Sequence, residues 1–163
     1  MKPYTVELAP VVTRPLEGTD EFIRQVVKRS NGALWNNGSF INREKHGHPG
    51  SISNHARGLA IDFSYRYNSS AGVGRKAGLG FINLLVANAD ALGVQLIIDY
   101  FPEPFGRSWR CDRGTWRKAT KPTFVGAPGG DWFHVEIALD KAVSANAVSL
   151  AFKGVFEDVT KPV

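Results

Sequence analysis

Two short segments of alternating polarity constrain the fold of this chain more than any other feature. Residues 59–65 read LAIDFSY and residues 131–139 read DWFHVEIAL, so bulky apolar residues alternate with small or polar ones. Such alternation is typical of a β-strand with one face in the core. Each segment carries an ionisable residue on its polar face, Asp62 in the first and His134 in the second. We therefore expect a sheet with one buried face and one face that holds polar chemistry.

Apolar residues at helical spacing predict three helices, over about residues 19–31, 75–92 and 143–152. Thr19 is a plausible N-cap for the first helix, because a hydroxyl at that position can accept a backbone hydrogen bond. Gly93 is expected to end the second helix, since glycine adopts the left-handed conformation that closes a helix.

The remaining segments complete the predicted fold class. Residues 94–100 form a short apolar strand, whereas residues 32–54 and 101–130 are predicted to be irregular, with one short strand around Phe40. Strands and helices alternate without a regular βαβ rhythm, so the sequence predicts an α+β fold. We expect a small antiparallel β-sheet with packed helices and a metal site at one end of the sheet.

The 163 residues are enough for one domain with a sizeable core. Residues 1–17, with three prolines, are predicted to form an extended arm, and residues 154–163 a linker to a further downstream domain. Cys111 is the only cysteine, which excludes an intramolecular disulfide and a cysteine-based zinc cluster. The sequence shows neither a secretory signal nor an apolar run of membrane-spanning length, so we expect cytoplasmic synthesis, no membrane insertion and a monomer.

Four residues carry the chemistry that the sequence predicts. His55 precedes the first alternating strand and Asp62 lies on its polar face, and an imidazole and a carboxylate suit zinc. His134, on the polar face of the other strand, is the candidate third ligand. Asp131 is the candidate catalytic base that takes a proton from the attacking water. Strict alternation points Asp131 away from His134, so this role requires a turn or bulge after two glycines.

The chain resembles a known family at these residues. The pattern SxHxxGxAxD of the M15/LAS zinc peptidases is matched in full by Ser53, His55, Gly58, Ala60 and Asp62. The second family motif, an acid followed after two residues by a histidine, resembles Asp131-Trp132-Phe133-His134. This group includes D-alanyl-D-alanine carboxypeptidases, dipeptidases and phage L-alanyl-D-glutamate endopeptidases. Hedgehog signalling domains share its fold.

The resemblance implies a function and a role for each matching residue. It implies Zn²⁺ as cofactor, His55, Asp62 and His134 as ligands, Asp131 as general base and Ser53 near the substrate. The usual base of the family is glutamate, so Asp131 is one methylene shorter. The family often has an upstream arginine that binds a substrate carboxylate, and Arg43 is its nearest equivalent here.

The implied substrate is a peptide bond in bacterial peptidoglycan. Because we find no export signal, we expect the peptidase domain of a phage endolysin that reaches the wall after release. The net charge of +5 suits the anionic groups of the wall. A D-Ala-D-Ala carboxypeptidase is one alternative, and a non-catalytic zinc module that binds wall or protein is another.

Several other features have two interpretations each. Six basic residues and two tryptophans between residues 107 and 121 fit a polyanion site, one rim of the cleft or a solvated loop, and nucleic acid is the least favoured partner. His46 and His48 are either a second metal site or solvated loop residues. Glu136, two residues after His134 on the same strand face, is either a partner that orients the imidazole or an exposed residue.

Overall fold

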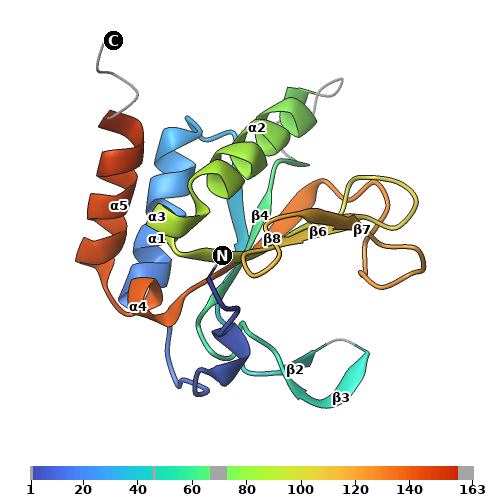
Figure 1. The fold of residues 1–163 in the computed structure, drawn as a ribbon, viewed down its shortest axis with the longest axis horizontal. Helices are drawn as coiled ribbons and strands as arrows, with labels where there is room; N and C mark the ends of the chain where they lie inside the picture. The colour runs from blue at the N-terminus through green and yellow to red at the C-terminus, as the bar shows by residue number, and fades with distance from the viewer. Residues whose placement is uncertain (1, 46, 67–72, 158–163) are drawn as a thin grey trace.

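The computed structural model describes residues 2–45, 47–66 and 73–157. Its centre is a six-stranded antiparallel sheet with the strand order β1-β4-β8-β5-β6-β7 (Figure 1). The strands are β1 (Trp35–Gly38), β4 (Ala60–Ser64), β5 (Val94–Asp99), β6 (Arg107–Arg110), β7 (Trp116–Lys118) and β8 (Trp132–Ile137). A separate two-stranded sheet joins β2 (Glu44–Lys45) to β3 (His48–Ile52). The predicted α+β class is confirmed, and so is an antiparallel sheet with packed helices.

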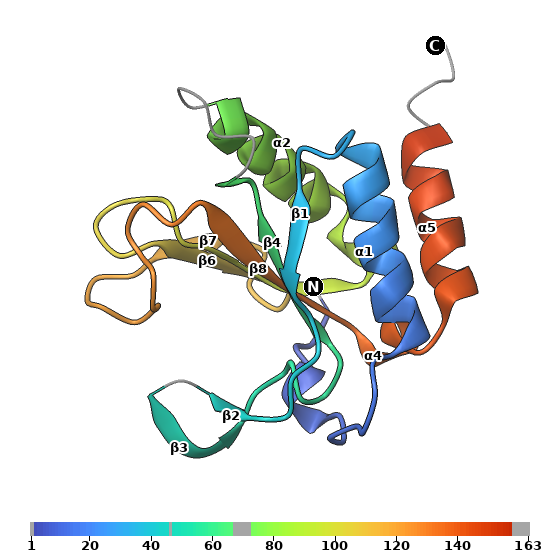
Figure 2. The ribbon, with the colours of Figure 1, turned by 180° about the vertical axis from the view of Figure 1, so that it is seen from behind.

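The helices gather on one side of the large sheet, and the β2–β3 hairpin lies on the other (Figures 1 and 2). These helices are α1 (Glu17–Arg29), α2 (Val73–Ala87), α3 (Ala89–Leu92), α4 (Leu139–Ala142) and α5 (Ala145–Glu157). The short 3-10 helix η1 (Val6–Leu8) lies on the hairpin side (Figure 1), where Glu7 pairs with Lys45 of β2. Figure 2 shows α1 and α5 side by side, and the rings of Phe22 and Phe152 meet edge to face between them, 5.1 Å apart. The part of the chain that the structure describes has no helix long and apolar enough to cross a membrane.

The core forms where the alternation predicts it. Ile61 and Phe63 of β4 and Phe133 and Val135 of β8 are fully buried in one hydrophobic cluster. The predicted helix over 75–92 is present as α2 followed by α3, and Gly93 closes it with a φ of 72°. The same face of the sheet therefore carries the core, and the opposite face is left for polar groups.

Two predicted loops contain strands. Residues 101–130 include the β6–β7 hairpin, in which Trp109 is buried and the Arg107 guanidinium stacks over Trp116, 4.2 Å from the ring centre. This hairpin is hard to recognise in the sequence, because its arginines interrupt the apolar alternation. In the folded chain these arginines pack through the aliphatic part of the side chain and the flat face of the guanidinium. Residues 32–54 include β1 and the β2–β3 hairpin, and the predicted strand near Phe40 ends earlier, at Gly38.

Two predictions about segment ends are wrong. Thr19 is not an N-cap, because α1 begins at Glu17 and the buried Thr19 hydroxyl donates a 2.5 Å hydrogen bond to the Gly58 carbonyl. This bond links α1 to the loop before β4, a tertiary contact that local sequence does not reveal. Residues 154–157 are the last turn of α5 rather than a linker, and residues 158–163 lie outside the described residues.

Candidate metal centre

The sheet register brings Asp62 and His134 together. β4 and β8 pair so that these two residues lie directly opposite each other in an antiparallel ladder. His134 Nδ1 lies 2.8 Å from Asp62 Oδ1. The pair sits in the middle of the β4–β8 ladder, which runs from Ala60–Glu136 to Ser64–Trp132, rather than at an end of the sheet as the sequence predicted.

A tight loop before β4 places His55 beside Asp62. Successive backbone hydrogen bonds from Ala56 to Ser53 and from Gly58 to His55 fold the loop just before β4. Gly58 has a φ of 68°, a conformation that favours glycine. A side chain there would also meet Leu16, with a Cβ only 2.9 Å from its Cγ. His55 is thereby buried with its Nε2 3.3 Å from Asp62 Oδ2.

The three side chains fit a divalent metal. One ligand atom from each of His55, Asp62 and His134 lies within 4.8 Å of the others. Zinc bonds of about 2.0–2.2 Å at tetrahedral angles place neighbouring ligand atoms roughly 3.3–3.5 Å apart. The observed His–Asp separations of 2.8 and 3.3 Å are close to that requirement. The predicted ligand residues therefore form a possible metal-binding triad.

Hydrogen bonds on the outer nitrogens orient both imidazoles. His55 Nδ1 lies 2.8 Å from the Ser39 carbonyl, which can only accept, so we assign the proton to Nδ1. His134 Nε2 lies 3.1 Å from Glu136 Oε1 and donates to that carboxylate. His55 Nε2 and His134 Nδ1 are the nitrogens left facing Asp62. Carboxylate and carbonyl partners of this kind fix the tautomer of metal-binding histidines.

Electrostatics couple the pair before any metal binds. Burial alone would raise the pKa of Asp62, but its interactions with the two histidines, above all the hydrogen bond from His134, hold it well below its usual range. Burial alone would lower the pKa of His134, but its hydrogen bonds with Asp62 and Glu136 raise it to about 10. In the metal-free protein His134 is thus an imidazolium that is hydrogen-bonded to two carboxylates.

This arrangement predicts a pH dependence of metal binding. A metal must displace the Nδ1 proton of His134, so affinity should rise about tenfold per pH unit below pH 10. The contribution of His134 to the stability of the metal-free protein has the opposite dependence. This stabilisation is complete below pH 6.5, the ordinary pKa that His134 has in the unfolded chain. It is lost as the pH rises through about 10, the pKa of His134 in the folded protein. Chelator competition at several pH values measures the first effect, and a pH-independent affinity would contradict it.

The triad lies in a cavity of about 370 Å³ on the polar side of the sheet. Arg43, Lys45 and Arg110 are the cations that line it. Tyr100 and Trp132 also line it and stack on each other with ring centres 3.7 Å apart. A cavity with cationic and aromatic walls suits a ligand that has both carboxylates and apolar groups.

The two predicted substrate-binding residues line this cavity but have different environments. Ser53 is buried, and its Oγ accepts a 3.3 Å hydrogen bond from the His55 backbone N–H, so it supports the loop. Arg43 is partly exposed, and its guanidinium donates only to the neighbouring Glu44 carbonyl, 3.3 Å away. Arg43 is therefore the better placed of the two to meet a ligand.

The structure does not bring Asp131 to the triad. The ladder continues past β8, because Tyr65 N–H donates to the Asp131 carbonyl, so Asp131 is not part of a bulge in this ladder. The Asp131 carboxylate instead lies 3.5 Å from Arg66 Nε, in a partly exposed pair, and does not line the cavity. Its role as catalytic base stays a prediction from the sequence pattern.

Of the two other histidines, His48 is described and His46 lies outside the described residues. His48 is exposed on β3 and lines the cavity without joining the triad. Cys111 is buried and unpaired, away from this cavity.

Sequence reasoning missed several residues that surround the triad. Tyr4 and Asn54 both hydrogen-bond to Glu136, and Tyr100 lines the cavity. Of the two interpretations of Glu136, the structure supports the partner of the imidazole, since Glu136 is buried and bonded to His134. Nothing in the local sequence of Tyr4 points to the site, because its contact with Glu136 spans 132 positions.

Comparison with protein-family models, with curated proteins and with solved structures found no match. A functional proposal for this chain therefore depends on the geometry of the triad and on the sequence motifs. These two observations concern the same residues: His55 and Asp62 of the first motif converge with His134 of the second.

Proposed function

We propose that this protein is a zinc-dependent peptidase that hydrolyses a peptide bond in bacterial peptidoglycan, in the manner of a phage lysin. The observation that carries the proposal is the convergence of His55, Asp62 and His134 at a cavity, with both imidazoles already oriented by outer hydrogen bonds. Structural zinc sites have four protein ligands, whereas catalytic sites keep one position for water. Three protein ligands at an accessible cavity favour catalysis.

The donor set favours zinc over other metals. Two imidazole nitrogens and one carboxylate oxygen suit zinc, whereas calcium and magnesium prefer six or more oxygen ligands. When bound, zinc supplies a Lewis acid and lowers the pKa of a coordinated water to about 7. The Ser39 carbonyl holds His55 and the Glu136 carboxylate holds His134 in the orientation that this requires, and Glu136 adds negative charge beside the His134 imidazole.

Proton transfer needs a carboxylate that is free to accept a proton. Glu136 is poorly suited, because its two oxygens already accept hydrogen bonds from Tyr4, Asn54 and His134. Asp131 is the acid of the sequence motif, and its pair with Arg66 is partly exposed. Such pairs contribute about 0–1 kcal/mol, so little holds Asp131 in that pairing. We propose that the Asp131 side chain leaves Arg66 when substrate binds and acts as the base.

The walls of the cavity support an acidic peptide substrate. Wall stem peptides carry free carboxylates, which Arg43, Lys45 and Arg110 are placed to attract. The tight Arg110–Asp112 pair, 2.7 Å between Nε and Oδ1, leaves Arg43 as the cation with fewer competing contacts. An internal stem-peptide or cross-link bond is the first choice, as the resemblance to the phage endopeptidases implies.

Digestion of purified peptidoglycan, with and without a chelator, tests this function. We expect new amino groups at an internal peptide bond, identified by mass spectrometry, that disappear with chelator and return when zinc is added. Release of terminal D-alanine alone would identify a carboxypeptidase instead. Cleavage that persists in the chelated, metal-free protein would contradict the proposal.

One observation favours a second candidate, a non-catalytic zinc module that binds wall or protein. Asp131 lies against Arg66 rather than at the triad, and a binding module needs no base. Stoichiometric zinc together with wall binding and no cleavage product would support this candidate over the peptidase.

A further inference from the structure

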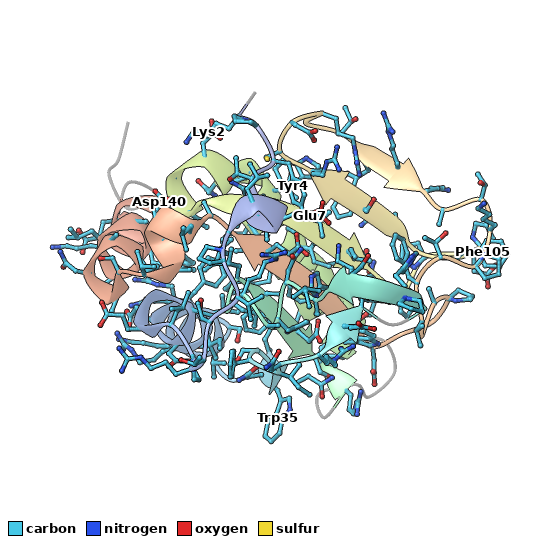
Figure 3. The ribbon with its side chains drawn as sticks, turned by 90° about the horizontal axis from the view of Figure 1, so that it is seen from below. Lys2, Tyr4, Glu7, Trp35, Phe105 and Asp140 are labelled. Atoms are coloured by element: carbon cyan, nitrogen blue, oxygen red, sulfur yellow. The ribbon has the colours of Figure 1, made fainter. Side chains whose placement is uncertain are left out.

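The N-terminal arm, residues 2–12, reaches the metal centre from far away in the sequence. Figure 3 shows Tyr4 and Glu7 on this arm where it crosses in front of the sheet. The Tyr4 hydroxyl donates a 2.6 Å hydrogen bond to Glu136 Oε2. Asn54 Nδ2 donates both to the Tyr4 oxygen, at 3.2 Å, and to Glu136 Oε1, at 2.7 Å. The arm and the loop before β4 therefore both donate hydrogen bonds to the Glu136 carboxylate.

A continuous chain of hydrogen bonds connects Tyr4 to the triad. Tyr4 bonds to Glu136, Glu136 bonds to His134 Nε2 at 3.1 Å, and His134 Nδ1 faces Asp62 at 2.8 Å. Glu136 is buried, so the loss of one hydrogen bond there removes one of the few partners of its carboxylate. Removal of the Tyr4 hydroxyl should loosen the carboxylate and, through it, the imidazole.

The arm is fixed in this position by contacts of the Tyr4 ring and of the residues that follow it. Thr5 N–H donates to Gln95 Oε1 at 2.7 Å, and Val6 is buried in the core. The Val12 N–H donates to the Ala56 carbonyl in the loop that carries His55. The Arg110 guanidinium packs over the Tyr4 ring, 4.9 Å from its centre. These contacts place the ring without the help of its hydroxyl, so the hydroxyl is available for a separate role.

Tyr4 is a permanent donor to this carboxylate. Burial and the nearby Glu136 raise the pKa of Tyr4 far above its ordinary value, so its proton stays in place. The Tyr4 hydroxyl is therefore the donor in its 2.6 Å hydrogen bond to Glu136. The Glu136 oxygen that faces Tyr4 has no other described hydrogen bond.

We propose that Tyr4 is a positioning residue of the metal centre, which orients the ligand His134 through Glu136 and makes the N-terminal arm part of the site. The proposal depends on metal binding by the triad, and so on that part of the proposed function, but not on peptide hydrolysis. Tyr4 acts through two intermediates and does not contact the metal.

The test measures metal affinity in Tyr4→Phe, which keeps the ring and its packing. We expect zinc affinity, measured by competition with a chromogenic chelator, to fall about tenfold, the lower end for hydrogen-bond partners of metal ligands. Tyr65→Phe is the matched control. It removes a buried tyrosine hydroxyl that donates to the Gly130 carbonyl at 3.0 Å, outside the triad, and should leave zinc affinity unchanged.

A double-mutant cycle separates positioning from general destabilisation. If Tyr4 acts through Glu136, then Tyr4→Phe should have no further effect in the Glu136→Gln background. The absorption spectrum of the Co²⁺-loaded protein should change in Tyr4→Phe and not in Tyr65→Phe. Equal zinc affinity in Tyr4→Phe and wild type, an equal loss in both Tyr→Phe variants, or additive losses in the cycle would each overturn the proposal. A wild-type protein that binds no zinc would instead overturn the proposed function.

Discussion

Replacement of His134 by alanine is expected to abolish stoichiometric zinc binding and to destabilise the metal-free protein. His134 lies between Asp62 and Glu136, and both carboxylates are largely shielded from solvent. Its removal leaves two negative charges close together without a cation. Loss of one partner from a buried ion pair typically costs about 3–5 kcal/mol of unfolding free energy. Zinc content by elemental analysis and chemical denaturation of the metal-free protein measure the two effects.

Two further histidine variants make this result interpretable. His55→Ala should also lose zinc but should destabilise the protein less, because Asp62 keeps its bond to His134. His48→Ala, in the same cavity but outside the triad, should retain zinc and stability. Stoichiometric zinc in His134→Ala, or zinc loss in His48→Ala to the same degree, would mean that the ligands lie elsewhere.

Replacement of Asp131 by alanine is expected to lower peptidoglycan hydrolysis by a factor of about a hundred or more, as loss of a general base typically does. Zinc content and fold should be preserved, since Asp131 contacts none of the triad and its pair with Arg66 is partly exposed. The rate of release of new amino groups from purified peptidoglycan measures the change.

Arg66→Ala is the control for this prediction. It removes the same ion pair but leaves the carboxylate, so it should retain most of the activity if Asp131 is the base. Full turnover in Asp131→Ala would place proton transfer on another group. A similar loss in both variants would mean that the Arg66–Asp131 pair supports the loop after β4 rather than the reaction.

Much of the sheet and of the triad follows from local sequence, for a simple physical reason. In β4 and β8 the side-chain period of two places the core residues on one face and Asp62 and His134 on the other. Pairing of the two strands then brings the polar residues together. His55 follows from the motif, in which Gly58 allows the loop to turn back before β4.

The features that sequence reasoning missed depend on distant contacts. The hydroxyl of Thr19 suits an N-cap, but α1 already begins at Glu17 and the hydroxyl donates to the carbonyl of residue 58 in the folded chain. The β6 segment looks like a basic loop because nothing local shows that Arg107 packs on Trp116 and pairs with Asp99. Tyr4 is a single aromatic residue in an arm without periodicity, and only the folded chain places it beside Glu136.

The position of β8 in the sheet has a consequence for how the protein is made. β8 lies between β4 and β5, although the ribosome synthesises it after both. Until residue 137 has emerged, the nascent chain has two strand edges that lack their shared neighbour, and such unpaired edges favour aggregation. His134 lies on this last strand of the sheet, long after the arm that holds Tyr4 in the sequence. Any metal capture by the triad therefore has to follow the synthesis of all six strands of the sheet.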